Sequence, residues 1–186
     1  RERMRIHLDD PEGRLDHREP FVLDGLAAYG LREDLLDLRL EGSPADAGRE
    51  AARAQGRLPQ GRVGEIAYSR EAERVEALAR RIQARRLEPF APPIPVDCDL
   101  GPVQVIGWLR GASALGLLVH RPTAAKPKDW IALWVRHLLL NALRPPGVAC
   151  ESRWLGEDEE IVLGPVADPM PLLERLAGIF WAGLSR

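Results

Sequence analysis

Several kinds of residue are scarce in this chain of 186 residues, and each shortage excludes a class of protein. There are only two cysteines, Cys98 and Cys150, with no CxxC pair, so a structural zinc or iron–sulfur site is not expected and a reducing cytoplasm fits best. No apolar run approaches the roughly 20 residues that cross a membrane. The net charge is −2, so any basic patch for a nucleic acid must be local.

The remaining composition is that of an ordinary globular domain. Hydrophobic residues make up 45% of the chain and charged residues 29%, which argues against disorder and allows one sizeable core. The sequence begins at Arg1 without an initiator methionine and ends at Ser185–Arg186. We therefore expect one compact domain taken from a longer polypeptide.

Residues 1–90 are predicted to form a mainly helical front part. A short strand is expected at Met4–Leu8, and the glycine-rich stretch Gln55–Gly64 is predicted to be a loop. Apolar residues three and four positions apart, with glycines or prolines after each run, predict the helices. These helices are expected over Leu23–Tyr29 with Gly30 as C-cap, over Leu31–Leu40, over Ala45–Ala54, and from Ser69 as an N-cap onward.

Residues 91–186 are predicted to form a β-rich core that ends in a helix, after a proline-rich connector at Pro89–Pro95. Strands are expected at Ile94–Leu100, Val103–Ala112, Leu115–Arg121, Val148–Leu155 and Glu160–Val166, the last two as a hairpin around Gly156–Glu159. Helices are expected at Asp129–Leu143, buried on several sides, and at Pro169–Leu184, burying Leu172, Leu173, Leu176, Ile179 and Phe180. The fold class predicted from this order is α/β (α+β), with a mixed central sheet flanked by helices.

The same order of elements is typical of the magnesium-dependent PD-(D/E)xK nucleases, whose core is restriction-endonuclease-like. Their chemistry needs an acid at the end of one strand and an acidic residue, any residue and a lysine on the next strand. Here Arg110 takes the first position, and Val119 and Arg121 take the outer two positions of the triplet. Asp129 is the one acidic residue between Gly101 and Cys150. Because two cations without a carboxylate repel Mg²⁺, we expect a degenerate nuclease core with no metal and no catalytic residue.

Four other residues could still carry chemistry. Asp97 and Asp99 share one face of a strand and are the nearest carboxylates that could restore a metal site, although a solvated strand face is the more common reason for such a pattern. His120 and His137 could be ligands or bases. His137 lies on the apolar helix, where a histidine with its hydrogen bonds satisfied inside the core is more common.

Basic residues make the segment from 101 to 144 locally cationic. Lys126 and Lys128 are the only lysines of the chain and flank Pro127 ahead of the apolar helix. Such side chains can contact the phosphates of a nucleic acid, and ordinary charged loop residues are the alternative. The candidates for contact with a DNA backbone are Lys126, Lys128, Arg136 and Arg144.

Several stretches, taken in order, carry a family resemblance. They are Glu19-Pro20-Phe21, Leu58–Gly61 (LPQG), Gly107–Gly111 (GWLRG), Leu117–Pro122 (LLVHRP), Trp134–Ala142 (WVRHLLLNA) and Trp181–Arg186 (WAGLSR). As an ordered set, they resemble the C-terminal region of the RecC proteins, the gamma subunits of exodeoxyribonuclease V.

The resemblance implies a nuclease-like fold without nuclease activity, inside the ATP-dependent heterotrimer that unwinds and degrades DNA ends for recombinational repair. It implies RecD-like and RecB-like subunits as partners, with this region docked onto the RecD helicase subunit and close to the separated DNA strands. It brings no cofactor and no catalytic residue. The leading hypothesis is therefore a non-catalytic domain for assembly and strand guiding. The alternatives are an active metal-dependent nuclease with displaced carboxylates, and a pure protein-interaction module without DNA contact.

Overall fold

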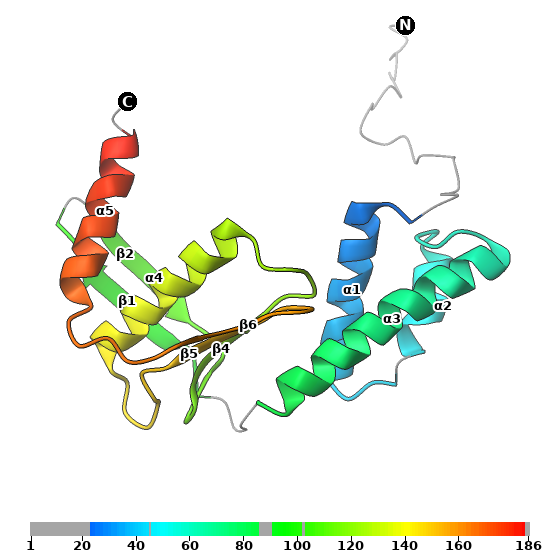
Figure 1. Ribbon diagram of the computed structural model, residues 1–186, viewed down its shortest axis with the longest axis horizontal. Helices are drawn as coiled ribbons and strands as arrows, with labels where there is room; N and C mark the ends of the chain where they lie inside the picture. Colours follow the sequence, from blue (N-terminus) through cyan, green and yellow to red (C-terminus); the bar gives the residue numbers. More distant parts are fainter. Residues whose placement is uncertain (1–22, 45, 86–90, 102, 185–186) are drawn as a thin grey trace, which may run out of the picture.

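The computed structural model describes residues 23–44, 46–85, 91–101 and 103–184, so the strand expected at Met4–Leu8 lies outside the described residues. Three helices come first, and six short strands with two more helices follow. Figure 1 shows the first three helices gathered on one side of the strands, with the last two helices on the other side. The predicted mixed α/β class is confirmed. No helix in these described ranges is long and apolar enough to span a membrane.

The first helix, α1 (Gly25–Leu40), replaces the two short helices that the sequence predicts there. Asp24 caps it, because the Oδ1 atom accepts a hydrogen bond of 2.8 Å from the backbone N–H of Ala27. The prediction of a C-cap at Gly30 is wrong, since Gly30 lies inside α1. A Cβ atom at Gly30 would lie 3.2 Å from Nη2 of Arg57, so the glycine leaves room for that side chain to lie across the helix.

The third helix also begins earlier than predicted. After α2 (Ala47–Ala54), which agrees with the expected helix, α3 runs from Gly61 to Gln83. The last four residues of the predicted loop are therefore helical, and Ser69 lies inside α3 rather than at its N-cap. Close packing requires a glycine at position 64, because a Cβ atom there would come within 1.9 Å of the carbonyl oxygen of Pro59.

The helices α1–α3 share one apolar core. Buried side chains recur every three or four residues along α1 and α3, as an amphipathic helix requires. An ion pair between Arg32 and Glu71, 2.9 Å apart and almost buried, also links these two helices. The buried residues of this helical core are Leu31, Leu35, Leu36, Ala52, Leu58, Tyr68, Val75, Leu78, Ala79, Ile82 and Leu155, the last of which comes from a strand.

The strands form two small sheets rather than the single central sheet that the sequence predicts. In the first, β1 (Ile94–Asp99) pairs antiparallel with β2 (Gln104–Leu109). The second has the order β3 (Ala112–Ser113), β4 (Gly116–His120), β5 (Ser152–Leu155) and β6 (Glu160–Leu163), in which β4 and β5 are parallel and the other pairs are antiparallel. The predicted hairpin of β5 and β6 is confirmed, although both strands are shorter than expected.

Gly111 separates the two sheets and breaks the strand predicted over Val103–Ala112. It has a φ of +80°, and a Cβ atom there would lie 2.8 Å from the carbonyl oxygen of Leu118. The carbonyl oxygen of Gly111 accepts a hydrogen bond of 3.0 Å from the N–H of Leu118. A residue with a side chain cannot easily meet both conditions, so the chain turns here and β3 starts a new pairing.

The last two helices cover one face of both sheets. Helix α4 (Pro127–Leu143) begins two residues earlier than predicted and buries Leu138, Leu139 and Leu140 against residues of β1, β2 and β4. Helix α5 (Met170–Leu184) joins the same core, but only Leu173 and Ala177 are fully buried. The prediction that Leu172, Ile179 and Phe180 lie inside is wrong, since all three are exposed.

The helical front part and the strands meet along a polar seam beside the helical core. The guanidinium of Arg81 in α3 donates hydrogen bonds to the carbonyl oxygens of Gly156 (2.7 Å), Glu157 (2.8 Å) and Glu159 (3.2 Å). Leu155, which is fully buried, enters the core of α1–α3 immediately before this turn. The hairpin of β5 and β6 is therefore held by both parts of the molecule.

Candidate functional site

The three positions of the degenerate nuclease pattern lie at strand ends, in different surroundings. Arg110 follows β2 directly and is exposed. Val119 lies in β4 and packs against the apolar cluster of Leu133, Trp154 and Ile161. Arg121 follows β4 directly. Because β2 pairs with β1 and β4 pairs with β3 and β5, Arg110 and Arg121 do not lie on hydrogen-bonded neighbouring strands.

Arg121 is the centre of a polar cluster that the sequence alone does not suggest. Its Nη1 donates to Oδ1 of Asp129 over 2.6 Å, and its Nε and Nη2 donate to the hydroxyl of Tyr29 over 3.2 and 2.7 Å. The guanidinium carbon also lies 5.3 Å from the centre of the Tyr29 ring, within the range of a cation–π contact. Tyr29 is 92 positions away in sequence, so no local pattern could have identified it.

The charge of this cluster is internally neutralised. Burial alone would raise the pKa of Asp129, but the hydrogen bonds from Arg121 and from the backbone N–H of Lys126 (3.0 Å) outweigh it, and the pKa is lowered. Burial, and then the hydrogen bond to Glu33, raise the pKa of the Tyr29 hydroxyl, which stays protonated at neutral pH. Asp129 is therefore an ionised partner of Arg121 and the cap of α4, with a hydrogen bond to each of its two oxygens.

Asp97 and Asp99, the carboxylates that could have restored a metal site, make local contacts within the described ranges. Oδ1 of Asp97 accepts a hydrogen bond of 2.8 Å from the amide of Gln104, and Oδ1 of Asp99 accepts one of 3.0 Å from the N–H of Gly101. Both side chains lie on the exposed face of β1. Across the described ranges, no group of three or more histidine, cysteine or acidic side chains has a geometry that could hold a metal ion.

The two histidines near the strands differ in role. His137 is fully buried, with Nδ1 2.9 Å from the hydroxyl of Ser152 and Nε2 3.0 Å from the carbonyl oxygen of Gly164. Burial lowers its pKa, so it is a neutral core histidine with both ring nitrogens occupied. His120 is partly exposed and lines a cavity of about 440 Å³ between the end of α1 and β4.

The four candidates for DNA-backbone contact do not form one patch. Lys126 and Lys128 are exposed at the start of α4, and Arg136 is exposed near its middle. Arg144 is the C-cap of α4 in a left-handed conformation with φ of 43°, and its side chain donates to the carbonyl oxygens of Asn141 and Ala167. Since a helix rises 1.5 Å per residue, the lysines and Arg144 lie at opposite ends of α4, roughly 25 Å apart.

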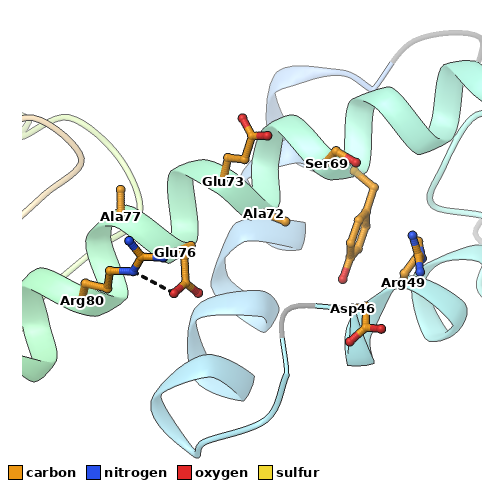
Figure 2. Close-up of a pocket in the computed structure, with 9 residues that line it drawn as sticks. Asp46, Arg49, Ser69, Ala72, Glu73, Glu76, Ala77 and Arg80 are labelled. Carbon is orange, nitrogen blue, oxygen red and sulfur yellow. Dashed lines mark hydrogen bonds and ion pairs between the residues drawn. The ribbon is translucent and has the colours of Figure 1, made fainter.

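A second cavity, of about 460 Å³, lies between α2 and α3 and is drawn in Figure 2. Asp46 and Arg49 lie on the α2 side, opposite Glu73, Glu76 and Arg80 of α3. Glu76 accepts hydrogen bonds from Arg39 (2.7 Å) and Arg80 (3.0 Å), and these lower its pKa although burial opposes them. Glu76 and Arg80 are thus paired with each other on the α3 side of this cavity.

Comparison with known proteins gives consistent matches. The family model described as the RecC C-terminal domain matches residues 1–186. The chain is 31% identical over 186 residues to the RecBCD enzyme subunit RecC of Escherichia coli (strain K12), covering 98% of this chain and 16% of that protein. It is 22% identical over 158 residues to the RecBCD enzyme subunit RecC of Buchnera aphidicola subsp. Acyrthosiphon pisum, covering 85% of this chain and 14% of that protein. The chain thus spans only about a sixth of the length of these relatives.

Proposed function

The chain belongs to the RecC C-terminal domain family, and from this premise we propose that it is a non-catalytic domain of a RecBCD-type enzyme in DNA repair and recombination. Its role is to support assembly with a RecD-like helicase subunit, beside a RecB-like subunit, and to guide the separated DNA strands. The observation that carries the non-catalytic part is the contact of Arg121 with Tyr29 and Asp129. The basic position of the nuclease pattern is occupied by a structural contact, and its acid positions hold Arg110 and Val119.

We also propose that the fold descends from the PD-(D/E)xK nuclease core. In support, β4 is joined through α4 to the parallel strand β5. The pair β1 and β2 precedes them in the chain, as the nuclease order requires. The break at Gly111 between β2 and β3 is a local interruption of what would otherwise be one long strand.

Two measurements, metal-dependent melting and DNA cleavage, distinguish this proposal from an active nuclease. Mg²⁺ or Mn²⁺ is expected to leave the melting temperature of the domain unchanged relative to EDTA, because a ligand that does not bind the folded state cannot stabilise it. Linear DNA incubated with either ion is expected to stay intact. Cleavage that disappears in a variant carrying Asp97→Ala and Asp99→Ala would establish the nuclease and reject the non-catalytic domain.

Assembly is tested in the full-length subunit. Deletion of this domain is expected to reduce recovery of the helicase subunit on co-purification at least several-fold. Recovery at the wild-type level would contradict a role in assembly.

The separation of the basic residues along α4 favours the third hypothesis, a protein-interaction module without DNA contact. Charge reversal of Lys126, Lys128 and Arg144 in the assembled enzyme separates the two functions. Strand guiding predicts weaker DNA binding with a smaller dependence on salt. Unchanged DNA affinity would favour the interaction module.

A further inference from the structure

The helices α1 and α3 cover one face of the second sheet but do not extend over the pair β1–β2. On β4, Leu118 packs against the core of α1–α3, as does Leu155 of β5. The neighbouring residue Leu117, which points to the other face, belongs to the core beneath α4 and α5. Helices α1 and α3 therefore cover one face of the second sheet, and α4 covers the other.

Among the residues that the structure describes, no helix gives the pair β1–β2 the corresponding cover. Leu109 of β2 and Val96 of β1 pack into the core beneath α4 and α5. Side chains alternate along a strand, so Ile106 and Trp108 point to the opposite face, on the side that α1 and α3 cover farther along. There Ile106 is 72% exposed and Trp108 is 61% exposed.

A cavity marks the point where the helical layer ends. It has a volume of about 440 Å³, and its floor is formed by Gly111 with Leu118 and His120 of β4. Its walls come from the end of α1 and from α3, and are formed by Asp37, Leu40, Glu41 and Ile82. Gly111, which lines the cavity, follows Trp108 by only three residues, so the chain leads from the exposed apolar side chains of β2 to the cavity. We refer to Ile106, Trp108 and this cavity as the uncovered sheet face.

Carboxylates surround the uncovered sheet face. Asp37 and Glu41 are exposed at the cavity, and Asp97 and Asp99 are exposed on the outer face of β1, where Asp97 is opposite Ile106 in the strand register. Arg110 is exposed directly after β2. The exposed carboxylates disfavour a phosphate backbone and favour a cationic partner.

We propose that the uncovered sheet face is a docking site for an amphipathic helix of a partner subunit, with an apolar stripe flanked by arginine or lysine. Such a helix continues the layer of α1 and α3, covers Ile106 and Trp108, and places cations beside Asp37 and Asp97. Aromatic residues at the centre of a protein interface, with charges at its rim, are the usual arrangement. This inference rests on the proposed role in assembly and specifies the surface.

Photocrosslinking in the assembled enzyme tests it. With p-benzoylphenylalanine in place of Trp108 in the full-length subunit, irradiation is expected to join this position to a partner subunit, at a peptide that combines apolar and basic residues. Substitution of Ile66, which is similarly exposed on α3, is the matched control and is expected to give at least about fivefold less of that product. A product with DNA, with a second copy or with the same chain, or no product at all, overturns the proposal.

Charge reversal gives an independent measurement. Asp37→Lys combined with Asp97→Lys is expected to reduce the crosslink from position 108 several-fold, whereas Arg110→Glu is expected to keep or increase it. The opposite order of effects overturns the proposal. Failure of the docking site is distinguishable from failure of the proposed function, because deletion of the domain would still impair assembly in the first case and would leave it intact in the second.

Discussion

Arg121 joins two parts of the chain that are far apart in sequence, the helix α1 through Tyr29 and the start of α4 through Asp129. Arg121→Gln is expected to lower the free energy of unfolding by about 1–3 kcal/mol. The loss is below the ~3–5 kcal/mol for breaking a fully buried pair, because water reaches part of the guanidinium. Urea denaturation measures the change.

Arg110→Gln provides the matched control for this prediction. Arg110 is exposed and forms no ion pair within the described ranges, so its replacement is expected to change the unfolding free energy by no more than about 0.5 kcal/mol. Equal effects of the two substitutions would show that Arg121 contributes nothing through its contacts.

His137 predicts a pH dependence of stability. Burial lowers the pKa of His137 below its ordinary value of 6.5, so the folded protein keeps it neutral while the unfolded chain takes up a proton below that value. The unfolded state then binds more protons, and the free energy of unfolding is expected to fall as the pH drops from about 7 to about 5. His137→Gln is expected to flatten this part of the curve. A slope that persists in the variant would assign it to another group.

The acidic residues act in a different pH range. The pKa of Asp129 and that of Glu160 are both lowered, since burial is outweighed by hydrogen bonds from Arg121 in the first case and from Arg153 and Arg85 in the second. Their contribution is present above their unfolded pKa values and is lost as the pH falls through the folded ones. The slope above pH 5 therefore remains a measure of His137.

The types of residue in the sequence predicted some features of the candidate site but not all of them. The apolar surroundings of His137 in the sequence indicated a core histidine, and its buried hydrogen bonds agree. The sequence also shows directly that Arg110 and Val119 occupy positions where the nuclease pattern has acidic residues. Tyr29 was not, because a contact across 92 positions leaves no local signal.

At the scale of elements, Gly30 in α1 and Gly64 in α3 differ in the space that the structure leaves for a side chain. Gly30→Ala places a methyl group 3.2 Å from the flexible end of Arg57, which can move. The variant is expected to gain up to about 1 kcal/mol of stability, because alanine favours a helix interior.

Gly64→Ala is the contrasting variant in the same fold. Its methyl group would lie 1.9 Å from a backbone carbonyl oxygen, which cannot move without shifting the chain. A loss of about 2–4 kcal/mol is expected. Thermal denaturation of both variants measures the pair, and a loss of similar size at Gly30 would contradict the packing argument.

Helix α5 extends past the core that its first half covers. Leu173 and Ala177 are buried, whereas Phe180 and Leu184, which continue the same stripe, are exposed. The isolated domain is therefore expected to self-associate through this end, and Phe180→Ser with Trp181→Ser is expected to lower its sedimentation coefficient toward that of a monomer. Unchanged association with an unchanged circular dichroism spectrum would place the contact elsewhere.

Local patterns predicted the regular elements and failed at their ends. Alternation identified β1, with Val96 and Cys98 inside and Asp97 and Asp99 outside. Glycines were misleading, because a glycine that permits close packing inside a helix looks the same in a sequence as one that ends it. The burial expected along α5 was wrong because amphipathic spacing cannot show where the neighbouring sheet stops.

At the scale of the whole molecule, Arg81 tests how firmly the helical front part holds the strands. Arg81→Met removes the hydrogen bonds to three carbonyl oxygens and is expected to cost roughly 2–4 kcal/mol. Hydrogen exchange should become faster in α1–α3 and in the turn between β5 and β6, with less change in β1–β2. Arg80→Met is the control, because Arg80 is 75% exposed and its ion pair in the described part of the chain is with Glu76, which is worth about 0.5 kcal/mol at most.

The burial of Leu155 within the core of α1–α3 also has a consequence for synthesis on the ribosome. The helices that surround this side chain are complete at Gln83, roughly 70 residues before Leu155 is added, which takes several seconds at usual elongation rates. During that interval the part of the α1–α3 core that Leu155 later covers lacks its strand residue. The nascent chain therefore presents a transient binding surface to chaperones, and slow codons between Gln83 and Leu155 are expected to prolong that exposure.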